Sequence, residues 1–242
     1  FKQENKMSKI NAYGDEENIV MTLDDWNSRW KKKHTAFHLP KVNENLVKHE
    51  NVLLDKQKMS VFVPLCGKTI DMKYIADKGH KVVGLECSEI AIHDFFNEHN
   101  IKFNKTKHPT SDFNIFQSED SSVTIYQGNL FLFNSDVSGK LDATWDRGAF
   151  VAINPSQRGA YFGVMSEVMK VGAKYLLNTF RYDPTKYCGP PFSIEDQEIA
   201  QLSENRFTIT ALGEFEAIND RQRSWGLDSF TEKHILYLLV EK

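Results

Sequence analysis

A glycine-containing loop and an acid about 20 residues after it are the residues of this chain best suited to hold a nucleoside. Gly67 lies in the loop 64–69 (PLCGKT), directly after the apolar segment 60–64. A glycine lets the backbone approach a bound group, and the next helix points free N–H groups at the loop. Glu86 ends the second apolar segment, where a carboxylate binds ribose hydroxyls in nucleotide-binding folds. The alternative for Glu86 is an ordinary acid on the surface.

The loop around Gly67 lacks the motifs that bind phosphate or pyrophosphate. Gly67-Lys68-Thr69 matches the end of a P-loop, but Phe62 stands where that motif requires its first glycine. A dinucleotide fingerprint requires three glycines in GxGxxG spacing, and the loop has one. A ribose-containing ligand without a pyrophosphate is therefore expected, and S-adenosylmethionine fits that description.

Two arginines could stabilise a developing thiolate. Arg147 follows the apolar segment 141–145, and Arg221 lies in a later loop with Trp225. Methyl transfer to sulfur is an in-line displacement by a thiolate, and a guanidinium favours the thiolate without exchanging a proton. A thiol that is already ionised then needs chiefly positioning and a dry pocket. The alternative for Arg147 is a strand-end ion pair with Asp146.

Other residues of chemical interest carry weaker signals. Trp26, Trp30 and Phe37 form an aromatic stripe that, taken alone, is typical of core packing. The basic run from Arg29 to Lys33 is typical of a solvated helix face. The histidines and cysteines lack metal-ligand spacing, so we expect no metal site and no disulfide framework for His38, His80, His93, Cys66, Cys87 and Cys188.

The surrounding pattern alternates short apolar runs with helical periodicity, which is typical of βαβ units and a mostly parallel sheet. Thr22 begins a helix with a capping-box signal, Ser88 can cap another, and Asn154-Pro155 opens a third that we expect to end near Val171. Further helices are expected over 42–54 and 70–77, the latter ended by Gly79. Strands are expected over 60–64, 80–86, 141–145, 174–180, 206–212 and 234–240, with a local hairpin over 113–117 and 123–126.

Composition limits the classes of protein that this chain can be. Its 242 residues, 40% of them hydrophobic, are enough for a single domain, which we expect over 21–242. We expect a flexible arm over 1–20. The fold interpretation does not include residues 1–6, which precede the first Met. A net charge of -3 gives no reason to expect a nucleic-acid partner. No apolar stretch approaches the roughly 20 residues of a membrane span. We therefore expect a cytoplasmic protein, which we take to be a monomer.

Motifs in the same order along most of the chain give a family resemblance. They begin with TLDDW at Thr22 and TAFH, continue with PLCGK, VGLECSE, WDRGA and AINP, and end with YDPTK, GPPF and SWG. In these motifs the sequence closely resembles animal thiopurine S-methyltransferases. The resemblance implies an α/β, Rossmann-like class I methyltransferase fold, a mostly parallel seven-stranded sheet with helices on both faces, and S-adenosylmethionine as cofactor.

The resemblance also implies roles for individual residues. It places the aromatic stripe over the cofactor instead of in the core, with Arg147 near the cofactor and the reacting sulfur. The implied cofactor-binding residues are Trp26, Trp30, Phe37, Leu65, Gly67, Glu86, Asn129, Leu130 and Arg147. The implied acceptor-binding residues are Phe37, Pro190 and Arg221, of which Arg221 joins Arg147 in the catalytic pair.

The implied activity is S-methylation of aromatic and heterocyclic thiols such as thiopurines, a reaction of xenobiotic metabolism with a small-molecule thiol substrate. The family often has Ser at the position of Asn129 and a basic residue or His at that of Gln222, and the segment 100–117 diverges from the family.

Two alternative functions stay open. One is a methyltransferase for small inorganic or aliphatic nucleophiles such as thiocyanate, sulfide or a metalloid, and the other is a non-catalytic cofactor-binding module.

Overall fold

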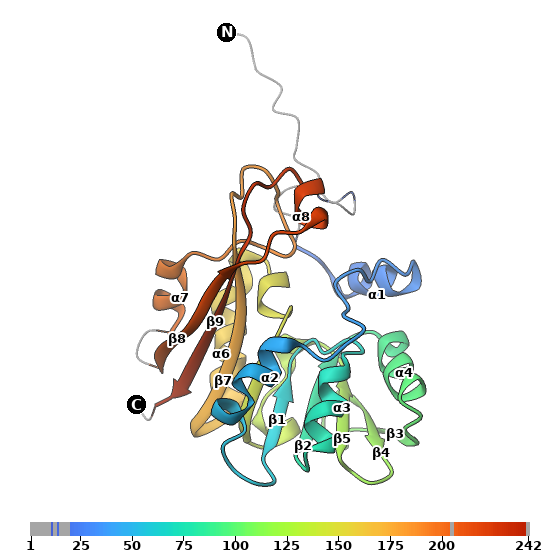
Figure 1. Cartoon of the computed structure of the whole chain (residues 1–242). Helices are drawn as coiled ribbons and strands as arrows, with labels where there is room; N and C mark the ends of the chain where they lie inside the picture. The colour runs from blue at the N-terminus through green and yellow to red at the C-terminus, as the bar shows by residue number, and fades with distance from the viewer. Residues whose placement is uncertain (1–10, 12–13, 15–19, 204–205, 241–242) are drawn as a thin grey trace.

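The computed structural model describes residues 11, 14, 20–203 and 206–240, and its elements surround one sheet (Figure 1). The described residues form nine strands in the order β3-β4-β5-β2-β1-β6-β7-β9-β8. The strands are β1 (Ser60–Val63), β2 (Lys81–Glu86), β3 (Phe103–Lys107), β4 (Asn114–Ser118), β5 (Val123–Gln127), β6 (Leu141–Asp146), β7 (Met169–Arg181), β8 (Phe207–Glu216) and β9 (Thr231–Leu239).

The centre of the sheet is parallel and both edges are antiparallel. Strands β5, β2, β1, β6 and β7 pair in parallel, whereas β3 and β4 extend one edge and β9 and β8 the other in antiparallel fashion. The hairpin predicted between 113–117 and 123–126 is the β4–β5 pair. The seven strands implied by the family resemblance were wrong, because the described residues form nine. The eight strand segments expected from the sequence pattern lacked β3. Only Phe103 of its sequence FNKTK is apolar, and such a polar edge strand lacks the alternation that marks a half-buried strand.

Helices cover both faces of the sheet, as predicted. One core contains Leu46, Met72 and Phe95 from α2, α3 and α4, and the other contains Phe162 and Ile199 from α6 and α7. The helices are α1 (Leu23–Lys31), α2 (Glu44–Leu53), α3 (Ile70–Asp77), α4 (Glu89–Glu98), α5 (Ser135–Ser138), α6 (Arg158–Val168), α7 (Asp196–Ser203) and α8 (Asp220–Ser224), with 3₁₀ turns η1 (Leu130–Leu132), η2 (Phe150–Ala152) and η3 (Pro155–Gln157).

The predicted helix ends are partly confirmed. Thr22 forms the predicted capping box with Asp25, and Gly79 follows α3 with φ of 87°. Asn154 caps the turn that leads into α6. The expected end near Val171 was wrong, since β7 already begins at Met169. Ser88 precedes α4 as expected, but its side chain makes no capping hydrogen bond.

The basic run is not wholly a solvated face, because Arg29 is buried with its guanidinium 4.9 Å from the Trp26 ring centroid. Cation–π attraction and an apolar stem allow an arginine to occupy such a place.

Most of the predicted arm over 1–20 lies outside the described residues. Asn11, which is described, is buried and donates a hydrogen bond from Nδ2 to the Gly189 carbonyl.

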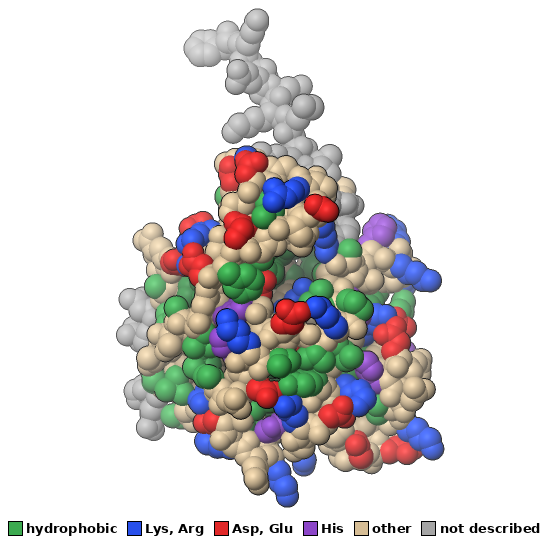
Figure 2. Space-filling model, in the orientation of Figure 1, with side chains coloured by type: hydrophobic (Ala, Val, Ile, Leu, Met, Phe, Trp, Pro, Cys, Tyr) green, Lys and Arg blue, Asp and Glu red, His purple; other side chains and the backbone are tan. Residues whose placement is uncertain are grey.

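On the face drawn in Figure 2, basic and acidic side chains are interspersed. Within the described part of the chain, no helix is both long and apolar enough to cross a membrane.

Candidate active site

One cavity of about 620 Å³ lies at the carboxyl ends of the parallel strands, where open α/β sheets bind ligands. In Figure 1, α1 and α8 both lie above this edge of the sheet. The cavity brings together every residue that the sequence singled out for binding or catalysis. These residues are Trp26, Trp30, Phe37, Leu65, Gly67, Glu86, Asn129, Leu130, Arg147, Pro190 and Arg221.

Backbone hydrogen bonds fix Glu86 at the end of β2. Its Oε2 accepts from the Gly67 N–H at 2.9 Å and its Oε1 accepts from the Ser88 N–H at 2.8 Å. Burial raises the pKa of this carboxyl group, and the two backbone donors act in the opposite direction. The strand-end acid is therefore not an ordinary surface residue. It joins the loop after β1 to the start of α4.

The loop after β1 has a conformation that only a few residues tolerate. Gly67 has φ of 51°, in the left-handed region that favours glycine. A Cβ at this position would lie 3.0 Å from Cζ2 of Trp30. The missing side chain thus allows the Trp30 ring to close over the loop backbone.

The aromatic stripe lines the cavity from above. The Phe37 ring packs edge-to-face against Trp30 and Trp26, with centroid distances of 5.7 and 6.3 Å. The segment after α1 therefore forms part of the cavity wall, and the contacts of these rings with a cofactor stay a prediction.

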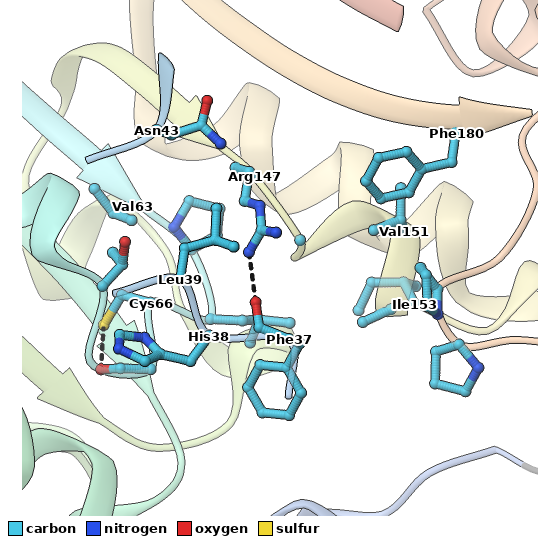
Figure 3. A pocket seen from close by; sticks show the side chains of 18 of the residues that line it. Phe37, His38, Leu39, Asn43, Val63, Cys66, Arg147, Val151, Ile153 and Phe180 are labelled. Carbon is cyan, nitrogen blue, oxygen red and sulfur yellow. Dashed lines mark hydrogen bonds between the residues drawn. The ribbon is translucent and has the colours of Figure 1, made fainter. Parts of the chain in front are cut away.

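Both predicted catalytic arginines hold that same segment. Arg147 donates from Nη1 to the Phe37 carbonyl at 2.6 Å (Figure 3), and Arg221 donates from Nη1 to the preceding carbonyl, of Ala36. Burial lowers the pKa of Arg147, and the charge of Arg221 lowers it further, while Asp71 and Glu232 raise it. Two cations from different parts of the chain therefore lie at one end of the cavity.

The Asp146–Arg147 doublet does not form the strand-end ion pair that was its alternative interpretation. Asp146 is fully buried and accepts hydrogen bonds from the Tyr161 and Tyr175 hydroxyls and from the Phe150 N–H. Successive side chains of a strand point to opposite faces. Asp146 consequently anchors α6 and β7 while Arg147 faces the cavity.

The remaining predicted residues sit at opposite ends of the cavity. The Asn129 side chain caps η1 by accepting from the Phe131 N–H at 3.0 Å, which fixes Leu130 in the wall. The Pro190 carbonyl accepts from the Tyr187 hydroxyl, and the Tyr187 ring stacks on Trp225 at 4.3 Å. Pro190 therefore belongs to an aromatic wall beside Arg221.

Sequence reasoning missed several residues of the cavity. Figure 3 shows Val151, Ile153 and Phe180 on the side of Arg147 away from Cys66. Asp71 and Glu232 are acids in the same lining. Asp71 sits in the first turn of α3, a position that only suggests a dipole interaction. Glu232 stands among polar residues at the start of β9, and nothing in its sequence context points to a cavity.

Comparison with known proteins identifies the family. The profile of the thiopurine S-methyltransferase family (TPMT) matches residues 21–241. Thiopurine S-methyltransferase of Rattus norvegicus is 41% identical over 94% of this chain and 95% of its own length, and that of Bos taurus is 40% identical over 92% and 91%.

Solved structures agree on the fold. The Burkholderia thailandensis 1,6-didemethyltoxoflavin-N1-methyltransferase, crystallised with S-adenosylhomocysteine, is 13% identical, with a TM-score of 0.58 over 90% of this chain and 87% of that one. The predicted class I methyltransferase fold and the family resemblance are both confirmed. The chain belongs to the thiopurine S-methyltransferase family.

Proposed function

We propose that this protein transfers a methyl group from S-adenosylmethionine to aromatic and heterocyclic thiols such as thiopurines, giving a thioether and S-adenosylhomocysteine. One observation supports this most strongly. At one end of a single cavity, the Gly67 loop and the buried Glu86 carboxylate would bind the nucleoside, and we call this the nucleoside end. Arg147 and Arg221 make a cationic end of the same cavity. Family membership supports the same donor and reaction.

The residues present fit the cofactor. The Gly67 backbone lies open beneath Trp30 where a Cβ would intrude, and Glu86 is held as a buried acceptor beside it. S-adenosylmethionine supplies an electrophilic sulfonium methyl group. Glu86 would accept hydrogen bonds from ribose hydroxyls, and the rings of Trp26, Trp30 and Phe37 would exclude water.

Arg147 and Arg221 would act on the acceptor. A guanidinium carries several N–H donors, so the bond from Arg147 to Phe37 leaves others for a thiolate. Partial burial strengthens such an interaction because the local dielectric constant is low. We propose that both cations stabilise the ionised sulfur without taking up its proton.

The lining of the cavity favours an apolar acceptor over thiocyanate or sulfide. Val151, Ile153 and Phe180 supply apolar surface on one side of Arg147. Incubation with methyl-labelled cofactor and 6-mercaptopurine or thiophenol tests the proposal. We expect labelled thioether from both, with slower turnover of thiocyanate and sulfide. Transfer to neither aromatic thiol would exclude the proposed acceptor class, and cofactor binding without any transfer would support a binding module.

We further propose that the enzyme acts as a monomer in the cytoplasm on a small-molecule substrate. Sedimentation at micromolar concentration should give the mass of one chain, and microscopy of the tagged full-length protein should give diffuse cytoplasmic signal.

A further inference from the structure

The proposed reaction leaves the proton of the acceptor thiol without a destination. Arginine stays protonated in proteins, so Arg147 and Arg221 stabilise a thiolate but do not deprotonate a thiol. Carboxylates are possible acceptors within reach. In the described lining of the cavity these are Glu44, Asp71, Glu86 and Glu232.

Two of these acids are already committed to structural bonds on both oxygens. Asp71 accepts from the Asn43 N–H at 2.8 Å and from Trp145 Nε1 at 2.9 Å. Glu86 accepts from two backbone N–H groups and lies at the nucleoside end. A third, Glu44, has a side chain that is 79% exposed and paired with Lys41.

Glu232 differs from the other three. Its side chain is 16% exposed, and its Oε1 accepts from Asn45 Nδ2 at 2.7 Å and from Asn178 Nδ2 at 2.9 Å. Among the described residues, none donates to Oε2 of Glu232. Its charge lies close enough to Arg147 to raise the pKa of that guanidinium. Glu232 thus presents a held carboxylate with one open oxygen at the cationic end of the cavity.

Two buried histidines form a chain of contacts that begins at this carboxylate. His234 Nε2 lies 3.3 Å from Glu232 Oε1, and His234 Nδ1 lies 3.1 Å from His49 Nε2. The ring of Phe215 packs edge-on against His234 at 5.2 Å. A His234 protonated on Nε2 donates to Glu232 and accepts from His49, so both rings can be neutral and bonded. Burial and the neighbouring His234 lower the pKa of His49, which favours that neutral form.

We propose that Glu232 takes up the proton of the acceptor thiol and that His234 and His49 are positioning residues for its carboxylate. This inference rests on the proposed function. The S–H bond breaks, the proton binds Oε2 of Glu232, and the electron pair left on sulfur forms the new S–CH₃ bond. The old sulfonium S–CH₃ bond breaks with its electron pair returning to the cofactor sulfur. The cation whose pKa Glu232 raises is Arg147, and the His234 ring lies against Oε1 of Glu232.

A series of acceptors with different thiol pKa values tests this assignment on the full chain. General-base catalysis contributes about 10²- to 10⁴-fold, and it matters only for a thiol that is still protonated. We expect Glu232→Gln to slow turnover of benzyl mercaptan by at least about 10²-fold and of pre-ionised 4-nitrothiophenol by less than about threefold. Glu167→Gln, in α6 and outside the cavity lining, is the matched control and should leave both rates unchanged.

Binding gives a second readout that does not depend on turnover. In wild type, a bound thiolate is repelled by the Glu232 carboxylate. Glu232→Gln should therefore lower the pH at which bound 4-nitrothiophenol ionises, followed by its thiolate absorbance with S-adenosylhomocysteine present. Easier ionisation together with slower turnover of weakly acidic thiols is a combination that a structural role does not produce.

Variants of two histidines provide the remaining tests: His234, and His38, whose imidazole also lines the cavity and is the alternative proton acceptor. His234→Leu should reproduce part of the loss with weakly acidic thiols, and His234→Gln, which still donates to Glu232, should restore much of it. An equal loss for all acceptors in Glu232→Gln, or a pKa-dependent loss in His38→Gln and none in Glu232→Gln, would overturn the proposal. Failure of the wild type to methylate any thiol would instead refute the proposed function.

Discussion

The two ends of the cavity are built in different ways. At the nucleoside end, Gly67 and Glu86 come from consecutive βα units and are joined through a backbone N–H. At the acceptor end, side chains link distant segments: Arg147 reaches the Phe37 carbonyl, Arg221 reaches that of Ala36, and Asn45 reaches Glu232. The nucleoside end therefore follows from local folding, whereas the acceptor end exists only after the whole chain has packed.

The largest expected effect comes from Glu86→Ala at the nucleoside end. Hydrogen bonds to a charged group contribute about 1.5–3 kcal/mol each, so loss of those to a ribose should weaken S-adenosylhomocysteine binding by at least about 10²-fold. Calorimetry measures the affinity, and the acceptor KM should change little. Equal affinity of wild type and variant would contradict the assigned role of Glu86.

Arg221→Ala should impair turnover of the acceptor without affecting cofactor binding. Loss of one charge-assisted hydrogen bond predicts about a tenfold or greater fall in kcat/KM for thiophenol, with cofactor affinity nearly unchanged. Arg221→Lys keeps the charge but loses the planar fork and should recover only part of the rate. A large loss of cofactor affinity in Arg221→Ala would show that the two ends are not separable.

Gly67→Ala should have a smaller effect, confined to the nucleoside end. The positive φ costs about 1 kcal/mol for a residue with a side chain, and the added Cβ presses on Trp30. We expect a fall in cofactor affinity of about five- to tenfold. Quenching of tryptophan fluorescence by the cofactor should weaken in parallel, and unchanged binding would argue against close approach at this loop.

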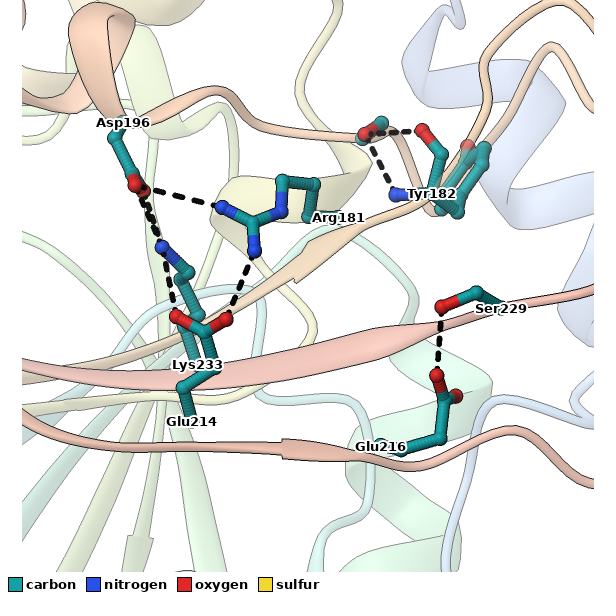
Figure 4. Close-up of polar contacts among 8 residues, drawn as sticks. Arg181, Tyr182, Asp196, Glu214, Glu216, Ser229 and Lys233 are labelled. Atoms are coloured by element: carbon teal, nitrogen blue, oxygen red, sulfur yellow. Dashed lines mark hydrogen bonds and ion pairs between the residues drawn. The ribbon is translucent and has the colours of Figure 1, made fainter.

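The smallest effect concerns a ring of charged residues outside the cavity lining. Arg181 and Lys233 each pair with Asp196 and Glu214, which ties α7 to β7, β8 and β9 (Figure 4). Because Asp196 is largely exposed, Asp196→Asn should lower the free energy of unfolding by no more than about 1 kcal/mol. Urea titration should show a smaller difference at high salt, while a change in cofactor affinity would mean that the ring supports the site.

The same contrast explains what could be predicted from the sequence. Gly67 and Glu86 were identified from spacing, because βα units place strand-end residues at one edge by a fixed rule. Strand β3 was missed because a polar edge strand has no alternating pattern. The Glu232–His234–His49 contacts were missed because they join β9 to α2, and no local signal records a pairing between such distant segments. The direction in which the Arg147 side chain points could also not be predicted without the fold.

Sequential calorimetry tests most directly whether the two ends of this cavity serve two ligands at once. S-adenosylhomocysteine is titrated to saturation, and thiophenol is then titrated into the binary complex. We expect one thiophenol bound per chain with the cofactor product still in place, and loss of only the second isotherm in Arg221→Ala. Displacement of S-adenosylhomocysteine by thiophenol, or no thiophenol binding to the binary complex, would contradict it.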